Sequence, residues 1–340
     1  MAAMQHKRRF RLLGLFLCLC LLLCSCAQQK EQPMTEPADQ DYIKWIDFDI
    51  PEPVLTRALR LDVESVNSDC HVGWVELLSL WAARNGGSFE DCRPDDLQKL
   101  YDARVSGKTA EELASNTKLY SYYTEAYGAV LGGMVGYYTE VRTDENGKLT
   151  TTECYGLRAF SPLAAGYHYT DYDDFGAARS YGYRRNHLGH DLLGSIGTPV
   201  VAVESGYIEH LGWNQYGGWR VGIRSLDGKR YYYYAHLRKN TPYADGLEEG
   251  QYVCAGEVIG YLGMTGYSVK ENVNGINTPH LHFGLQIIFD QSQIDGWNQI
   301  WIDLYDLTHF LAQNRAPTRA GATAGKRVST VYYLYPEQPD

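Results

Sequence analysis

Hydrophobic and polar positions follow two different periods along this chain. In the stretch 54–66, apolar residues stand at Leu55, Ala58 and Leu61, which is the spacing of one face of a helix. From 181 to 289, apolar and polar residues instead alternate in short runs separated by turns. The two periods predict an α+β protein, with an N-terminal helical domain followed by an antiparallel β-sheet or sandwich domain.

Capping residues mark helix boundaries within residues 42–150. Gly86 is a typical residue to end a helix, and Pro94 is typical of a first helical turn. Thr109 and Glu112 have the spacing of a capping box, which predicts a long helix running to about position 130. No catalytic motif occurs in this region, so the sequence does not predict its role.

Turn residues divide the second half of the chain into strands. Asp227 and Gly228 are a strong hairpin signal, and they separate expected strands at 219–224 and 230–236. A final long strand is expected at 280–289. No helical pattern intervenes, which favours an antiparallel arrangement.

Two polar segments flank these strands. Residues 151–179 form a connector whose three aspartates between 171 and 174 predict a solvated acidic loop. The chain is again polar after about Gln313, and we expect residues 314–340 to be a loosely attached tail.

The N-terminus has the pattern of an export signal. Several basic residues precede an apolar run at 12–23, which is too short to span a bilayer but has the length of a signal-peptide core. Ser25 and Cys26 follow, as in a bacterial lipobox. We expect residues 1–25 to be a lipoprotein signal peptide, Cys26 to be lipidated, and residues 26–41 to be a tether. The protein is then exported and held by a lipid anchor on the outer face of the cytoplasmic membrane; an ordinary cleaved signal peptide is the alternative.

Charge and cysteine content narrow the class of partner. The chain carries a net charge of −10, so it lacks the basic surface that nucleic-acid binding requires. An acyl anchor therefore suits its membrane association better than a basic patch. Four cysteines lie beyond the signal region and none forms a C-x-x-C pair, so they do not indicate a zinc site, and their pairing is left open. They are Cys70, Cys92, Cys154 and Cys254.

Two histidines share one face of the last strand. Residues two apart on a strand point the same way, so His280 and His282 face one side, while Leu281 and Phe283 face the core. On the strand before, the same alternation places His236 on a face with Tyr232 and Tyr234, which makes these tyrosines candidates for lining a cleft. A His-x-His pair alone is a weak signal.

A further pair of candidate ligands lies upstream of these strands. His187 and Asp191 are four apart with Gly189 between them, a spacing that lets a turn or strand end wrap around one ion. Imidazole and carboxylate are normal zinc ligands, and two histidines with one carboxylate leave a fourth position for water. Such an open site is typical of a catalytic metal.

The order and spacing of these motifs resemble a known family. His187-x-Gly-x-Asp191, Tyr234-Ala-His236-Leu and His280-Leu-His282-Phe occur in the order of the lysostaphin-type, LytM-like zinc metalloendopeptidases. The resemblance covers about residues 181–289 and implies a β-rich zinc peptidase domain, for which we expect bounds of 151–313.

The resemblance also implies a role for each matching residue. His187, Asp191 and His282 correspond to the ligands of one zinc ion per chain. His236 and His280 correspond to the catalytic histidines, and which of them is the general base stays open. The family also often has a tyrosine upstream of the first ligand, so the candidates for oxyanion or substrate contact are Tyr181, Tyr183, Tyr232 and Tyr234.

The implied function is hydrolysis of amide bonds in peptidoglycan peptides, at a cross-link or a bridge, by metal-activated water. Two alternatives remain open at this stage. One is a non-catalytic cell-wall-binding regulator that keeps the metal site. The other is a zinc carboxypeptidase or amidase that acts on the same polymer.

Overall fold

The computed structural model describes residues 42–180 and 184–337. The expected signal peptide, the lipidation site Cys26, and both Tyr181 and Tyr183 lie outside these ranges. Residues from Tyr42 onward form one compact unit.

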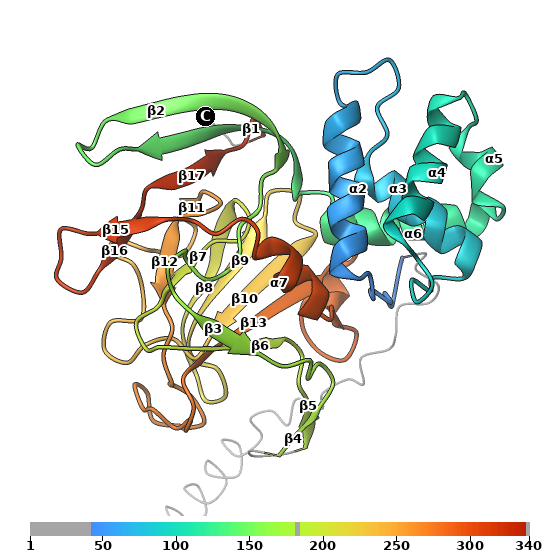
Figure 1. The fold of residues 1–340 in the computed structure, drawn as a ribbon. Coiled ribbons are helices and arrows are strands. Elements are labelled where there is room, and N and C mark those ends of the chain that lie inside the picture. Colours follow the sequence, from blue (N-terminus) through green and yellow to red (C-terminus); the bar gives the residue numbers. More distant parts are fainter. Residues whose placement is uncertain (1–41, 181–183, 338–340) are drawn as a thin grey trace, which may run out of the picture. The chain divides into compact units, whose positions relative to one another are not determined.

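The N-terminal part is helical, as expected (Figure 1). Its helices are α2 (Glu52–Ser65), α3 (Trp74–Asn85), α4 (Pro94–Val105), α5 (Ala110–Ala114) and α6 (Thr117–Leu131). Gly86 ends α3 in the left-handed conformation with φ of 62°, and the Thr109–Glu112 capping box begins α5. The single long helix expected after Thr109 is wrong. Ser115 adopts φ of 61°, and Asn116 caps a separate helix by accepting a hydrogen bond from the amide of Leu119 at 3.1 Å.

The helices and the β-region share one hydrophobic core. Leu55, Leu77 and Val130 are fully buried in the same cluster as strand residues of the second half. Trp74 of α3 packs on Phe310 of α7 (Tyr305–Leu311), with ring centroids 5.8 Å apart. The shared core therefore couples the helical region to the β-region.

A three-stranded sheet joins distant parts of the chain. It has the order β17-β1-β2, formed by β1 (Val135–Thr143), β2 (Leu149–Leu157) and β17 (Val331–Leu334). Residues 135–143 are therefore a strand within the stretch expected to be helical.

The expectation of a loose tail is also wrong for the described part of residues 314–340. The pair β15 (Thr318–Ala320) and β16 (Arg327–Ser329) precedes β17, which pairs with β1. Val331, Tyr333 and Tyr335 alternate toward the interior and are each at most 5% exposed. Their period of two holds the segment against the sheet despite its polar composition.

The main sheet is antiparallel and has eight strands, in the order β11-β8-β9-β10-β13-β6-β3 with β14 paired to β13 (Figure 1). The strands are β3 (Tyr169–Asp171), β6 (His190–Gly194), β8 (Gly206–Asn214), β9 (Gly218–Ser225), β10 (Arg230–Ala235), β11 (Tyr252–Val253), β13 (His280–Ile287) and β14 (Ile300–Trp301). Smaller pairs are β4 (Ala178–Arg179) with β5 (Arg185–Asn186), and β7 (Pro199–Val201) with β12 (Val258–Tyr261). The expected turn at Gly228, with φ of 74°, connects β9 and β10.

The two faces of β13 differ, as its alternation predicts. Leu281, Phe283 and Leu285 are at most 1% exposed and belong to the core. His282 and Gln286 lie on the other face and line a cleft. The sheet thus presents one row of polar side chains from a rigid strand.

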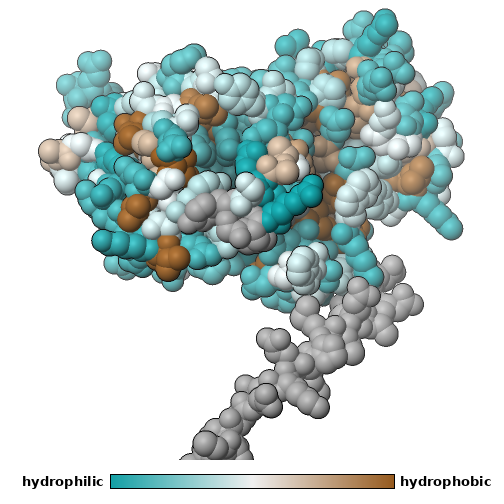
Figure 2. Space-filling model, turned by 90° about the horizontal axis from the view of Figure 1, so that it is seen from below, coloured by the Kyte–Doolittle hydropathy of each residue, from teal (hydrophilic) through white to brown (hydrophobic). Residues whose placement is uncertain are grey.

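The surface and the cysteines add two observations. On the face shown in Figure 2, hydrophilic residues predominate and apolar residues form separate patches. No helix among the described residues is long and apolar enough to cross a membrane. Cys70, Cys92, Cys154 and Cys254 are free thiols, so the disulfides left open by the sequence do not form in this structure.

Candidate metal centre

Strand pairing brings three candidate ligands together from distant parts of the sequence. His282 of β13 lies directly opposite Asp191 of β6 in the antiparallel register. His187 follows β5, and two backbone hydrogen bonds hold it in place, from its amide to Ala177 and from the amide of Gly176 to its carbonyl, each 2.8 Å. We call His187, Asp191 and His282 the metal triad.

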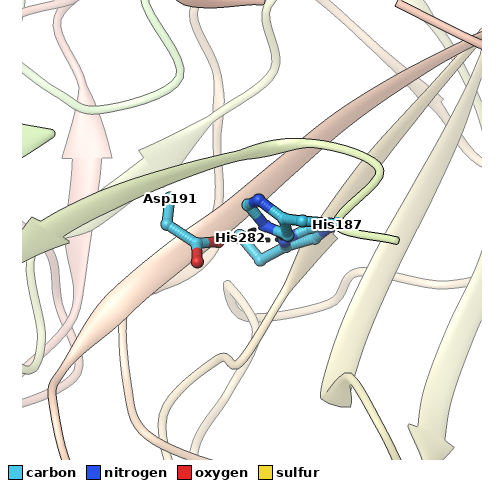
Figure 3. Close-up of side chains that lie close together, drawn as sticks. All are labelled: His187, Asp191 and His282. Atoms are coloured by element: carbon cyan, nitrogen blue, oxygen red, sulfur yellow. Dashed lines mark hydrogen bonds and ion pairs between the residues drawn. The ribbon is translucent and has the colours of Figure 1, made fainter. Parts of the chain in front are cut away.

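The three side chains of the metal triad point toward one another (Figure 3). His187 Nε2 lies 3.0 Å from Asp191 Oδ1 and 2.9 Å from His282 Nδ1, and His282 Nδ1 lies 2.9 Å from Asp191 Oδ1. Ligands at 2.0–2.2 Å around a tetrahedral ion are separated by about 3.3–3.6 Å, so a small outward movement of this near-equilateral triangle would fit one small cation. The donor atoms also suit zinc. The metal site expected from the sequence is therefore present.

Neighbouring groups orient the first ligand. His187 Nδ1 lies 3.2 Å from the carbonyl oxygen of Asp174 and 3.0 Å from its carboxylate Oδ1. Both neighbours are acceptors, so Nδ1 carries the hydrogen and Nε2 presents its lone pair to the site. Arg179 contacts the carboxylate of Asp174 and lies 3.5 Å from Asp191 Oδ2. The expectation of a merely solvated acidic loop missed this role of Asp174.

Gly189 is required by the close approach of the ligands. A Cβ atom at this position would lie 2.6 Å from His282 Cε1 and 2.8 Å from the carbonyl oxygen of Phe283. A side chain would therefore push His282 away from the triangle. Steric contact with His282 therefore explains why a glycine stands between the first two ligands.

Burial and mutual contacts determine the charges of the metal triad. Burial alone would raise the pKa of Asp191, but the contacts with the imidazoles of His187 and His282 hold it well below its usual range, so the carboxylate is ionised. Burial lowers the pKa of His282, which favours the neutral imidazole. Burial would also lower the pKa of His187, yet Asp191 and then Asp174 raise it. A proton held among these three atoms is the one that a metal ion would displace.

Two further histidines stand beside the metal triad. The rings of His236 and His280 have centroids 4.7 Å apart, and His236 is 5.9 Å from His282. His280 Nε2 approaches Asp191 Oδ1 to 3.8 Å. His236 Nδ1 donates to the carbonyl of Thr265 at 2.9 Å, and His280 Nδ1 donates to that of Thr278 at 2.8 Å. In the neutral form of each ring the hydrogen is therefore on Nδ1 and Nε2 is the acceptor.

Burial keeps His236 neutral. Its side chain is only 6% exposed, and burial lowers its pKa well below the usual value, with His280 and His282 lowering it further. A neutral imidazole can accept a proton at neutral pH.

The expectation that Tyr232 and Tyr234 line the cleft is wrong. Both are buried in the core, where the Tyr232 hydroxyl donates to Glu204 at 2.7 Å and the Tyr234 hydroxyl accepts from the amide of Val203 at 3.0 Å. Strand β10 ends at Ala235, and His236 adopts φ of 61°, so the alternation of faces stops before the histidine.

The cleft instead receives the other two tyrosines of β10. Tyr233 lies opposite Gly284 and Tyr231 lies opposite Gln286 in the pairing with β13, on the same face as His282. The Tyr233 ring packs edge-on against His282, with centroids 5.8 Å apart. Alternation counted along the sequence from His236 instead places Tyr231 and Tyr233 on the face away from that histidine.

A cleft of about 600 Å³ joins the metal triad to His236 and His280. Tyr231, Tyr233 and Trp301 also line it. It is large enough for a peptide segment rather than a single small ion.

His190 belongs to a different cluster. It is 2% exposed, and its Nε2 lies 2.9 Å from Asp171 Oδ2, the same oxygen that His309 Nε2 approaches to 2.7 Å. We call His190, Asp171 and His309 the bridging triad. These contacts engage His190 away from the metal triad, which explains why the neighbour of Asp191 is not a ligand.

Comparisons with known proteins agree with this geometry. Residues 185–295 match the model of peptidase family M23. The L-Ala–D-Glu endopeptidase of Bacillus subtilis is 34% identical over 176 residues, which are 49% of this chain and 52% of that protein. Lysostaphin from Staphylococcus simulans is 42% identical over 98 residues, which are 28% of this chain and 17% of that protein. The chain thus spans about half the length of the first relative and less of the second.

A solved structure is also similar. The catalytic domain of lysostaphin from Staphylococcus simulans is 32% identical, with a TM-score of 0.31, and the match covers 42% of this chain and 92% of that one. The part of the chain that carries the metal centre, residues 185–295, is therefore similar to peptidase family M23.

Proposed function

We propose that this protein is a zinc endopeptidase that hydrolyses amide bonds in the peptides of bacterial peptidoglycan. The observation that carries the proposal is the joint presence of the metal triad and the pair His236 and His280 in one cleft. The names of the relatives support the substrate class, since they include an L-Ala–D-Glu endopeptidase and a peptidoglycan DD-endopeptidase from Vibrio cholerae. We propose zinc because the ligand set is two imidazoles and one carboxylate.

The metal triad would hold the ion, and the histidine pair would handle protons. A bound zinc ion supplies a water molecule of pKa near 7 and polarises the scissile carbonyl. In the neutral form of His236 and His280 the hydrogen lies on Nδ1, which donates to a carbonyl, so Nε2 is the proton acceptor. One of them can accept the proton of the attacking water and return it to the leaving amine, and the other can accept a hydrogen bond from that water and orient it.

The two histidines differ in their neighbours. His280 lies nearer to Asp191, while His236 is held deeper against Thr265. We therefore propose both as catalytic residues, with the metal triad as ligands.

The decisive experiment is digestion of purified cell wall. Protein loaded with one equivalent of zinc should release fragments whose new termini lie inside the peptide, as shown by mass spectrometry. Release of a terminal residue would indicate a carboxypeptidase, and separation of peptide from glycan would indicate an amidase. Bound zinc with no fragment from any cell wall would support the regulator and contradict the proposed function.

We also propose that the chain is exported and anchored through a lipid on Cys26. The support is the apolar run at 12–23 followed by Ser25 and Cys26. Cys26→Ala should release the protein from membranes or block its processing. Unchanged membrane retention with the same mature mass would contradict the anchor. Tyr181 and Tyr183 stay candidates for substrate contact, supported by their neighbours Arg179 and Arg185, which both line the cleft.

A further inference from the structure

The floor of the cleft extends from the metal centre across three strands. Opposed residues of an antiparallel pair share a face, so Tyr233 and Tyr231 of β10 continue the row of His282 on β13. On β9, Gly222 pairs with Tyr233 and Arg224 pairs with Tyr231, and these two β9 residues therefore face the cleft as well. Arg220, two residues before Gly222, shares that face and lines the cleft.

Arg220 has no counter-ion. Among the residues that the structure describes, none accepts a hydrogen bond from its guanidinium or forms an ion pair with it. The Nε atom of Arg220 is buried without a partner. Its neighbour Arg224 is different, because Nε and Nη2 bind the two oxygens of Glu209 at 2.6 and 2.8 Å. An arginine that is only partly exposed normally finds a carboxylate, so the unpaired charge of Arg220 requires an explanation.

The other arginines of the cleft are already engaged. Arg179 contacts the carboxylates of Asp174 and Asp191. Arg185 lies over the rings of Tyr216 and Tyr267, at 4.9 and 5.5 Å from their centroids. In all, four arginines line the cleft against three carboxylates, although the whole chain has a net charge of −10. A positive excess inside an acidic protein attracts anionic groups to that place.

The surroundings of Arg220 support a binding role. Burial raises the pKa of Tyr231 and of Tyr233, and the positive charge of Arg220 opposes that rise in both, which places it near the two hydroxyl groups. Tyr233 also accepts a hydrogen bond from Asn214 Nδ2 at 3.3 Å. Two phenols and an amide therefore stand beside the guanidinium as additional polar contacts for a ligand.

The distance to the metal centre suits a peptide. In the β9–β10 pairing Val221 lies opposite Tyr234, so Arg220 falls beside Ala235, which pairs with His282. Adjacent strands are about 4.8 Å apart, so the backbone of Arg220 is about 10 Å from that of His282. An extended peptide covers this distance in about three residues.

We propose that Arg220 binds a free carboxylate of the peptide substrate, within about three residues of the bond that is cut. The protein would therefore select acidic peptides over neutral ones such as oligoglycine. This inference rests on the proposed function for the position of the scissile bond. Bidentate pairing of guanidinium with carboxylate supplies the recognition.

The test uses two synthetic peptides that differ in a single group. One is L-Ala-γ-D-Glu-L-Lys-D-Ala with an amidated C-terminus, and the other carries an amide in place of the glutamate α-carboxylate. Calorimetry would measure their dissociation constants on zinc-loaded protein in a His280→Ala background, in which turnover is expected to be slow. The acidic peptide should bind about 10-fold to 100-fold more tightly, as expected for one charge-assisted pair.

Substitution of Arg220 should remove this preference. Arg220→Gln should bind the two peptides about equally, with unchanged affinity for the neutral one and an unchanged melting temperature. Arg220→Lys keeps the charge but not the bidentate geometry of the guanidinium, so it should restore part of the preference. The matched control is Arg319→Gln, at an exposed arginine of β15 outside the cleft, which should bind like the parent.

The outcomes separate this inference from the proposed function. Equal affinities in the parent, no measurable binding of either peptide, or a preference that survives Arg220→Gln would overturn the role of Arg220, even if cell wall is cut. A preference that depends on Arg220, together with intact cell wall after digestion, would keep the carboxylate site and reject the peptidase. An equal loss of affinity for both peptides would show a structural role and also overturn the inference.

Discussion

The molecule contains two clusters of two histidines and one aspartate, and both use strand β6. The metal triad draws one ligand from β6 and opens onto the cleft, whereas the bridging triad draws the preceding residue of β6 and does not line the cleft. Within the bridging triad His190 is buried and His309 is partly exposed. In the metal triad the three donor atoms converge on each other at about 3 Å. In the bridging triad both histidines meet one carboxylate oxygen, and among the described residues only the metal triad satisfies the spacing of a metal site.

The difference shows that residue type does not define a metal site. The same side chains hold an ion when their lone pairs converge from three directions, and they form a structural bridge when the carboxylate lies between the imidazoles. The cleft separates the two clusters further, because the metal triad lines a cavity large enough for a peptide and the bridging triad does not. The following predictions test this contrast, from the largest expected effect to the smallest.

The largest effect is expected for a ligand of the metal triad. His282→Ala removes one of three donors, so zinc content should fall far below one equivalent and hydrolysis of cell wall should fall to background. Metal analysis by mass spectrometry and a turbidity assay would measure both. His309→Ala, the matched change in the bridging triad, should keep one zinc and most of the activity. Full zinc occupancy in His282→Ala would show that the ligands are wrongly assigned.

A catalytic histidine should affect turnover without affecting metal. His280→Ala or His236→Ala should lower kcat by about 10²-fold to 10⁴-fold, the usual contribution of a positioned acid or base. Zinc should stay near one equivalent, and substrate binding should change little, since the interaction forms mainly in the transition state. Steady-state kinetics with parallel metal analysis would measure this. Wild-type activity in either variant, or loss of zinc in both, would contradict the division of roles.

A smaller effect is expected for Asp174, which contacts the ligand His187. Asp174→Ala removes the carboxylate beside His187 Nδ1 and the partner of Arg179. Loss of such an orienting group typically lowers metal affinity by about 10-fold to 100-fold. Competition with a chelator of known affinity would measure the change. The contrast would fail if Asp171→Ala, in the bridging triad, weakened zinc to the same degree.

The smallest effect on function, with a measurable effect on stability, is expected in the bridging triad. Asp171→Ala leaves the buried Nε2 of His190 without its partner, which should cost about 1–3 kcal/mol in the free energy of unfolding. Zinc content should not change. Denaturant unfolding followed by metal analysis would show both. A stability equal to that of the parent would mean that the bridge contributes nothing to the fold.

Expectations from the sequence succeeded where a local period or a short spacing carried the information. The alternation around His282 correctly separated its core face from its cleft face, since one buried face determines strand register. The same reasoning failed one strand away, where the positive φ of His236 interrupts the alternation and exchanges the faces of the tyrosines. The segment around Tyr333 failed for another reason, because its partner strand β1 lies almost two hundred residues earlier in the chain.

The sequence by itself determined the α+β class and the hairpin at Gly228, because each depends on neighbours close along the chain. It also identified the residues of the metal triad, through the order and spacing of motifs that resemble a known family. Only the tertiary structure decided which distant polar groups meet. It placed Asp174 behind His187, turned Tyr231 and Tyr233 into the cleft, and left Arg220 without a counter-ion beside them. These contacts come from strand register and loop packing, and a one-dimensional pattern does not specify which strands become neighbours.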